Sequence, residues 1–167
     1  WSSDVCSSDL LLGFEALLRW QHPKQGLLTP DLFLPLAEKT GLIIPIGNWV
    51  INEACRQLRE WHLQGHQSWS MAVNLSTLQF EQPSLVNTVL NCLALHHVPP
   101  EMLILEVTET TAMSNPDESV RVLTELTKAG VKASIDDFGT GYSSLLYLKR
   151  LPACELKIDR AFVKELS

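Results

Sequence analysis

The chain has 167 residues, of which 46% are hydrophobic and 19% charged, and its formal net charge is −6 at pH 7. This composition predicts one soluble globular domain and argues against disorder. No apolar run reaches the roughly 18 to 20 residues that span a bilayer, and residues 1–10 lack a secretory-signal pattern, so we expect a cytoplasmic location. The negative charge argues against a nucleic-acid groove, but it allows a phosphorylated small molecule if metal ions neutralise the site.

Strand-like and helical patterns alternate along the chain. Apolar runs of the strand type lie, in chain order, at residues 11–20, 70–76, 102–108, 132–138 and 154–159. Helical patterns follow at residues 30–40, 45–64, 83–96, 116–129 and 143–151. This alternation predicts parallel strands joined by right-handed crossovers, in either an open α/β sheet or a barrel.

Each predicted strand carries a chemically capable side chain near its carboxyl end. These residues are Glu15 with Arg19, Asn74, Glu106, Asp136 with Asp137, and Lys157 with Asp159. Strand alternation places Glu15, Leu17 and Arg19 on one face, and likewise Lys157 and Asp159. The carboxyl ends of all strands converge on one site in a TIM-type barrel, whereas an open sheet spreads them along an edge. The pattern therefore favours the barrel.

Two adjacent carboxylates, Asp136 and Asp137, end an apolar run just before a loop with two glycines. Neighbouring strand residues point to opposite faces, so these acids converge only if the chain turns there, and Gly139 and Gly141 allow such a turn. Two acids so close resist ionising together unless a cation neutralises them. The set Glu15, Asn74, Glu106 and Asp136 offers only oxygen donors. Such donors suit Mg²⁺ or Mn²⁺ better than structural zinc.

A two-metal site would explain both aspartates. Asp136 could bridge to a second ion ligated by Asp137, and two ions about 3.5 to 4 Å apart are a standard solution for phosphodiester hydrolysis. Lys157 could then hold the attacking water or the developing charge. Taken singly, Glu106 or Asp159 is more simply a salt-bridging acid, and Arg19 a solvated charge. Recurrence at every strand end favours a site.

Five ordered segments together resemble the EAL domains, bacterial phosphodiesterases that linearise cyclic di-GMP. The segments are Gly-Phe-Glu-Ala-Leu-Leu-Arg-Trp-Gln-His-Pro at 13–23, Ala-Val-Asn-Leu-Ser at 72–76, Leu-Glu-Val-Thr-Glu at 105–109, Asp-Asp-Phe-Gly-Thr-Gly-Tyr-Ser-Ser-Leu at 136–145 and Leu-Lys-Ile-Asp at 156–159. The resemblance implies an α/β fold, a TIM-like (βα)8 barrel that is incomplete in this chain. It also implies two Mg²⁺ or Mn²⁺ ions and conversion of cyclic di-GMP to linear pGpG by metal-activated water.

The resemblance also implies a role for each matching residue. The first metal would be held by Glu15, Asn74, Glu106 and Asp136, and the second by Asp137. Lys157 would contact the catalytic water, and Glu109 would hold the loop at 137–144, which in the family also links metal binding to dimerisation. Substrate binding would fall to Arg19, Leu17 and Asp159.

The two ends of the chain depart from the family pattern. Residues 1–10 repeat Ser-Ser-Asp where the family has a strand with a Gln-Pro pair, and we interpret them as a non-native, adapter-like leader before a partial domain at residues 11–167. The chain stops at Ser167, before the family's Glu-Gly-Val-Glu region and its later glutamine. Five strands cannot close an eight-stranded barrel, so we expect the chain alone to be inactive.

Three functions remain open at this point. The first is a metal-dependent cyclic di-GMP phosphodiesterase, which is favoured because every metal-ligand position in the matching segments keeps its expected residue type. The second is a non-catalytic cyclic di-GMP receptor or protein-interaction module. The third, an unrelated barrel enzyme acting on another phosphoester, requires the ordered motifs to be coincidental. A homodimer and attached sensory or cyclase domains are the family-level expectations for partners.

Overall fold

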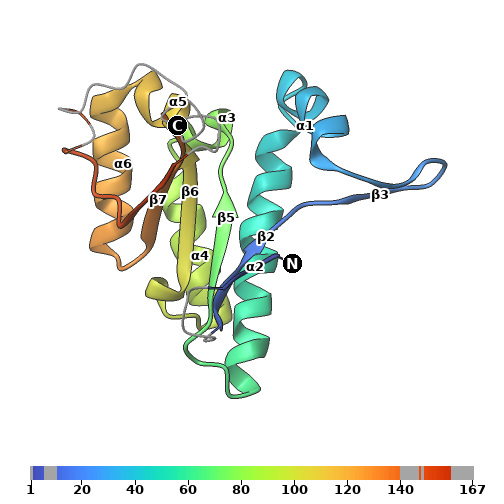
Figure 1. Cartoon of the computed structure of the whole chain (residues 1–167), viewed down its shortest axis with the longest axis horizontal. Coiled ribbons are helices and arrows are strands. Elements are labelled where there is room, and N and C mark those ends of the chain that lie inside the picture. The colour runs from blue at the N-terminus through green and yellow to red at the C-terminus, as the bar shows by residue number, and fades with distance from the viewer. Residues whose placement is uncertain (1, 6–10, 140–146, 148, 159–167) are drawn as a thin grey trace, which may run out of the picture.

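The largest element of the fold is a six-stranded sheet (Figure 1). A computed structural model describes residues 2–5, 11–139, 147 and 149–158. The strands, in their order across the sheet, are β1 (Ser2–Val5), β2 (Leu11–Ala16), β5 (Ser70–Asn74), β6 (Leu103–Thr108), β7 (Lys132–Phe138) and β8 (Glu155–Ile158). β1 pairs antiparallel with β2, and every other neighbouring pair is parallel.

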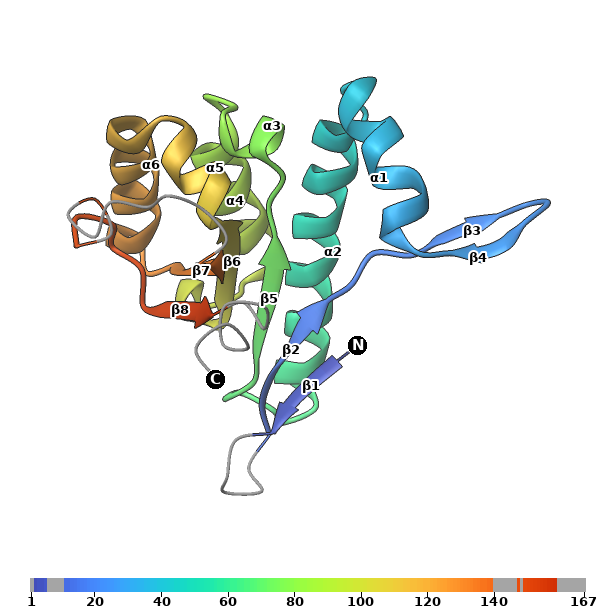
Figure 2. The ribbon, with the colours of Figure 1, turned by 45° about the horizontal axis from the view of Figure 1, so that its top comes forward.

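Helices connect the parallel strands, and the three longest of them lie on one face of the sheet (Figure 1). The helices are α1 (Pro30–Lys39), α2 (Ile43–Leu63), α3 (Thr77–Phe80), α4 (Leu85–His96), the 3₁₀ turn η1 (Pro100–Met102), α5 (Glu109–Ser114) and α6 (Pro116–Lys128). Figure 2 shows the sheet curling away from α2, α4 and α6, as in part of a TIM-like barrel. None of the described helices combines the length and the apolarity that a bilayer crossing needs.

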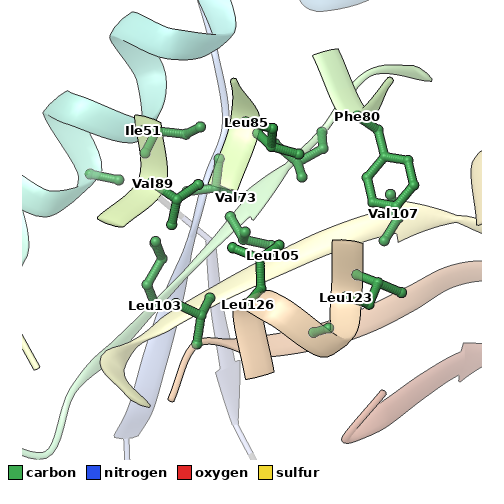
Figure 3. Packing of buried hydrophobic residues seen from close by; sticks show 14 of the residues in the cluster. Ile51, Val73, Phe80, Leu85, Val89, Leu103, Leu105, Val107, Leu123 and Leu126 are labelled. Carbon is green, nitrogen blue, oxygen red and sulfur yellow. The ribbon is translucent and has the colours of Figure 1, made fainter. Parts of the chain in front are cut away.

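The hydrophobic core fills the space between the sheet and these helices (Figure 3). Leu103, Leu105 and Val107, alternate residues of β6, are fully buried there. Ile51 of α2 and Leu123 of α6 lie in the same cluster. Burying each large aliphatic side chain stabilises the fold by about 1.5 to 3 kcal/mol. The residues between them in β6, which include Glu106, therefore face the concave side of the sheet.

The first predicted strand is shorter than expected. It ends at Ala16, and residues 20–28 instead form a separate hairpin in which β3 (Trp20–His22) pairs with β4 (Gly26–Leu28). The predicted strand over residues 11–20 was wrong in its second half, and Leu17 and Arg19 do not share a strand face with Glu15. The reason is local, because Gly26 takes a left-handed conformation with φ of 74° at the hairpin turn.

The remaining predicted elements differ from the structure mainly at their ends. α4 begins at Leu85 rather than residue 83, and the short helices α3 and α5 were not predicted. The helix expected at residues 143–151 falls largely outside the described residues. Ser2–Val5 forms an edge strand with an irregular register, and the interpretation of residues 1–10 as a non-native leader stays a prediction.

Candidate functional site

A cluster of polar side chains lies on the concave face of the sheet, near the carboxyl ends of five neighbouring parallel strands. Its members are Glu15 of β2, Asn74 of β5, Glu106 of β6, Asp136 of β7 and Lys157 of β8. The strand registers align Asn74 with Glu106 and place Asp136 opposite Thr108, two residue pairs beyond Glu106 along the β6–β7 ladder. The predicted convergence of these strand ends is therefore present in the structure.

Two hydrogen-bonded pairs organise the cluster. Asn74 Nδ2 donates to Glu15 Oε1 at 2.7 Å, which joins β2 to β5. Lys157 Nζ donates to Glu106 Oε1 and forms a salt bridge with it, reaching from β8 across β7 to β6. The Glu106 side chain is 1% exposed and that of Lys157 is 27% exposed. The Lys157 ammonium is therefore the partner that compensates a buried carboxylate.

The cluster carries more negative than positive charge. Burial raises the pKa of Glu106, and the charges of Glu15 and Asp136 add to this rise, while the bond from Lys157 opposes it. Burial lowers the pKa of Lys157, but Glu106, Glu15 and Asp136 together raise it further, so that the net pKa is above its ordinary value. Three carboxylates thus share one ammonium, and the site favours binding of an additional cation.

The chain turns at the two adjacent aspartates, as the sequence predicts, but the turn is at Asp137 itself. Asp137 has φ of 55°, and its N–H donates to Asp136 Oδ1 at 2.9 Å. The β7–β8 register shifts between Ile135 and Phe138, which is the signature of a bulge. Gly139 follows with φ of 101°. The bulge lets consecutive acids depart from the strict alternation of a strand.

Glu109 lies beside the start of the loop after Asp137. The N–H of Gly139 donates to Glu109 Oε2 at 2.7 Å, and Glu109 is 1% exposed. Glu109 begins α5, whose N-cap is Thr108, the last residue of β6. The bond joins the end of β7 to the end of β6. Residues 140–146 of this loop lie outside the described residues.

The residues predicted to bind substrate are placed differently from one another. Leu17 and Asn74 line one cavity of about 400 Å³. Arg19 lies beyond the end of β2, where its Nη1 donates to Leu18 O at 2.7 Å, and it lines a neighbouring apolar cavity with Trp20. The cavity that Arg19 lines with Trp20 contains no residue of the acidic cluster. Asp159 lies outside the described residues.

Some residues of the site were missed by the sequence reasoning. The hydroxyls of Ser76 and Thr108 cap α3 and α5 immediately after β5 and β6 end. The Thr77 and Thr111 hydroxyls then join these two helices at 2.7 Å. A Ser or Thr directly after a strand is an N-cap signal that could have revealed both helices. Ser134 is fully buried and pairs with Glu106 in the β6–β7 ladder. The sequence indicated its position only because Ser134 lies two residues before Asp136 and so shares a strand face with it.

The chemistry of the cluster suits a hard divalent cation. Its donors are carboxylate and amide oxygens, and Glu106 Oε2 is buried without a hydrogen-bond partner among the described residues. As these described side chains are placed, no three of the His, Cys, Asp or Glu residues could hold one ion. Glu15 is engaged with Asn74, and Glu106 with Lys157. A cation would therefore have to exchange with the Asn74 and Lys157 donors.

A comparison with protein families assigns the chain to a family. The family model described as EAL domain matches residues 3–167. The chain belongs to the EAL domain family. The resemblance seen in the five sequence segments is thereby confirmed, and the TIM-like barrel architecture is the fold of this family's solved members that the chain matches.

Two Pseudomonas aeruginosa proteins are similar to this EAL chain. The bifunctional diguanylate cyclase/cyclic di-GMP phosphodiesterase MucR is 62% identical over 157 residues, covering 94% of this chain and 23% of MucR. The cyclic di-GMP phosphodiesterase NbdA is 48% identical over 152 residues, covering 91% of this chain and 19% of NbdA. The chain thus spans less than a quarter of the length of these two relatives.

A solved structure gives the corresponding comparison in space. The MucR phosphodiesterase in complex with cyclic di-GMP superposes with a TM-score of 0.90 at 62% identity. The superposition covers 94% of this EAL chain and 64% of the solved chain. The curled parallel sheet with its outer helices is therefore the EAL barrel in part.

Proposed function

We propose that the EAL domain represented by this chain hydrolyses cyclic di-GMP to linear pGpG. The observation that carries the proposal is the convergence of an oxygen-donor set and a lysine at the carboxyl ends of five parallel strands, the face at which TIM-type barrels place their active sites. MucR and NbdA, both named as cyclic di-GMP phosphodiesterases, support it. In this proposal the domain acts in bacterial second-messenger signalling.

The proposed cofactor is a pair of Mg²⁺ or Mn²⁺ ions. The first would be held by Glu15, Asn74, Glu106 and Asp136, and the second by Asp137 with Asp136. When bound, such ions supply an activated water and stabilise the charge that develops on the phosphate oxygens. The surplus of carboxylates over ammonium groups in the cluster supports this assignment.

The other residues of the chain would position the water, the loop and the substrate. Lys157, released from Glu106, would hold the attacking water, and Glu109 would fix the loop after Asp137 through Gly139. Leu17 would contact the substrate beside Asn74, whereas Arg19 would have to leave Leu18 O to reach a substrate phosphate. Asp159 keeps its proposed role in substrate binding.

The wider setting is also part of the proposal. The domain would work in the cytoplasm, as a homodimer formed through the loop after Asp137. Attached sensory or cyclase domains are supported by MucR, which is named as bifunctional and of which this chain covers 23%.

The decisive experiment measures conversion of cyclic di-GMP to pGpG in Mn²⁺. It uses the 167-residue chain and, in parallel, the chain extended along its gene to the length of the solved MucR phosphodiesterase. Glu15→Ala and Asp136→Ala should each lower turnover by more than about 100-fold, because ligand loss should exceed the effect of losing an outer-shell partner. Far-UV circular dichroism should show the fold retained, since both side chains lie outside the hydrophobic cluster.

Glu101→Ala is the matched control, because it removes an exposed carboxylate from η1, which precedes β6 and so lies at the amino end of that strand, opposite the end that carries the site. Unchanged hydrolysis in Glu15→Ala or Asp136→Ala would show that the residue is not a ligand. Tight binding of cyclic di-GMP without cleavage by the extended wild-type protein would replace the enzyme by a receptor.

A further inference from the structure

Two neighbouring polar atoms under the acidic cluster are buried without partners. Among the described residues, neither Glu106 Oε2 nor Ser134 Oγ makes a hydrogen bond. Glu106 and Ser134 are directly paired across the β6–β7 ladder. Neighbouring strands lie about 4.8 Å apart, and side chains of a directly paired couple project from the same face. The two orphaned atoms therefore belong to one small buried region.

Lys157 closes this region from above. Ser134 pairs with Glu155 of β8, and Lys157 lies two residues further along β8 on the same face as Glu155. The Lys157 side chain crosses β7 to reach Glu106 Oε1, and Ser134 is 0% exposed. Asp136, two residues after Ser134, faces the same side of β7. Ser134 thus lies beneath the Lys157–Glu106 ion pair and beside Asp136.

The donors and acceptors of this region complement one another. Lys157 satisfies one oxygen of Glu106 and leaves the other as a buried acceptor, while a serine hydroxyl provides one donor. Leaving both groups unpaired costs free energy, and alanine would occupy the space of Ser134 without this cost.

We propose that Ser134 is a positioning residue for Glu106, whose Oε2 accepts a hydrogen bond from the Ser134 hydroxyl directly or through one water. The inference rests on the proposed function, because it treats Glu106 as a ligand of a divalent cation. Held by Ser134 at Oε2, Glu106 offers Oε1 alone to Lys157 or to the cation. Ser134 itself contacts neither the cation nor the substrate.

The test compares Mn²⁺ affinity, measured by isothermal titration calorimetry, in the extended wild-type protein, Ser134→Ala and Ser134→Thr. Loss of an outer-shell partner weakens metal binding by about 10- to 100-fold, which is the expected result for Ser134→Ala. Ser134→Thr keeps the hydroxyl and should recover part of the affinity. Ser119→Ala is the matched control, because Ser119 is equally buried but lies in α6, and its affinity should be that of wild type.

Thermal unfolding without metal gives a second readout. Ser134→Ala should lower Tm if the hydroxyl is bonded, and should leave Tm unchanged or raise it if the hydroxyl has no partner. Wild-type Mn²⁺ affinity in Ser134→Ala, with cleavage of cyclic di-GMP by the wild-type protein, would overturn the role of Ser134 and leave the proposed function standing. A wild-type protein that neither binds Mn²⁺ nor cleaves would overturn both.

Discussion

Replacing Lys157 by methionine removes the cation that compensates buried Glu106. Lys157 Nζ is bonded to Glu106 Oε1, and the Glu106 side chain is 1% exposed. Methionine keeps most of the length and the apolar stem of lysine but has no charge. In metal-free protein, Lys157→Met should therefore leave a carboxylate buried beside Glu15 and Asp136 with no ammonium group to balance them.

The size of the effect follows from the burial of the pair. Removing one partner of a buried ion pair costs about 3 to 5 kcal/mol, and the 27% exposure of Lys157 places this pair at the lower end of that range. For a domain of this size, each kcal/mol lowers Tm by about 2 to 4 °C, so Lys157→Met should lower Tm by about 6 to 12 °C. Glu106→Gln removes the buried charge that Lys157 compensates. In the Glu106→Gln background, Lys157→Met should therefore lower the free energy of unfolding only slightly.

A double-mutant cycle measures this coupling. Wild type, Lys157→Met, Glu106→Gln and the double variant are unfolded in urea with EDTA present and followed by far-UV circular dichroism. The coupling free energy should be about 2 kcal/mol or more, since contacting charged residues are not additive. If Lys157→Met costs the same with glutamate and with glutamine at position 106, the ion pair does not stabilise the fold and the reasoning fails.

Two further predictions concern the core thiol and the choice of metal. Burial, with a smaller contribution from Cys92, raises the pKa of Cys55 from 9.0 to about 12. As the pH rises, the unfolded chain therefore loses the thiol proton before the folded protein does. The stability that this thiol contributes below pH 9 is lost as the pH rises toward 12. The free energy of unfolding of wild type relative to Cys55→Ala should fall by about 1.4 kcal/mol between pH 8 and pH 10 in urea titrations, and a difference independent of pH would contradict the burial argument. Hydrolysis by the extended protein should proceed with Mg²⁺ or Mn²⁺ but not with Ca²⁺, whose larger and looser oxygen coordination misplaces the water; equal pGpG production with Ca²⁺ would argue against the proposed site.

The sequence by itself determined which residues face the core and which face the site in the central strands. In β6, Leu105 is buried against the helices while Glu106 faces the concave side, and Val73 and Asn74 alternate likewise in β5. This follows because a strand has a period of two residues, so that the pattern of apolar and polar residues can be read along the chain. The ordered motifs likewise indicated the EAL family before any coordinates.

Only the tertiary structure decided where the first strand ends and how the charges of the site are paired. β2 stops at Ala16 because the following residues pair within their own hairpin, and Asp137 adopts a positive φ where β7 loses its register with β8. Lys157 and Glu106 are 51 residues apart in the chain, and they meet because β7 lies between their strands. Hydrophobic alternation is a local property of the chain, whereas the Lys157–Glu106 pair and the register of β7 with β8 depend on which distant strands become neighbours.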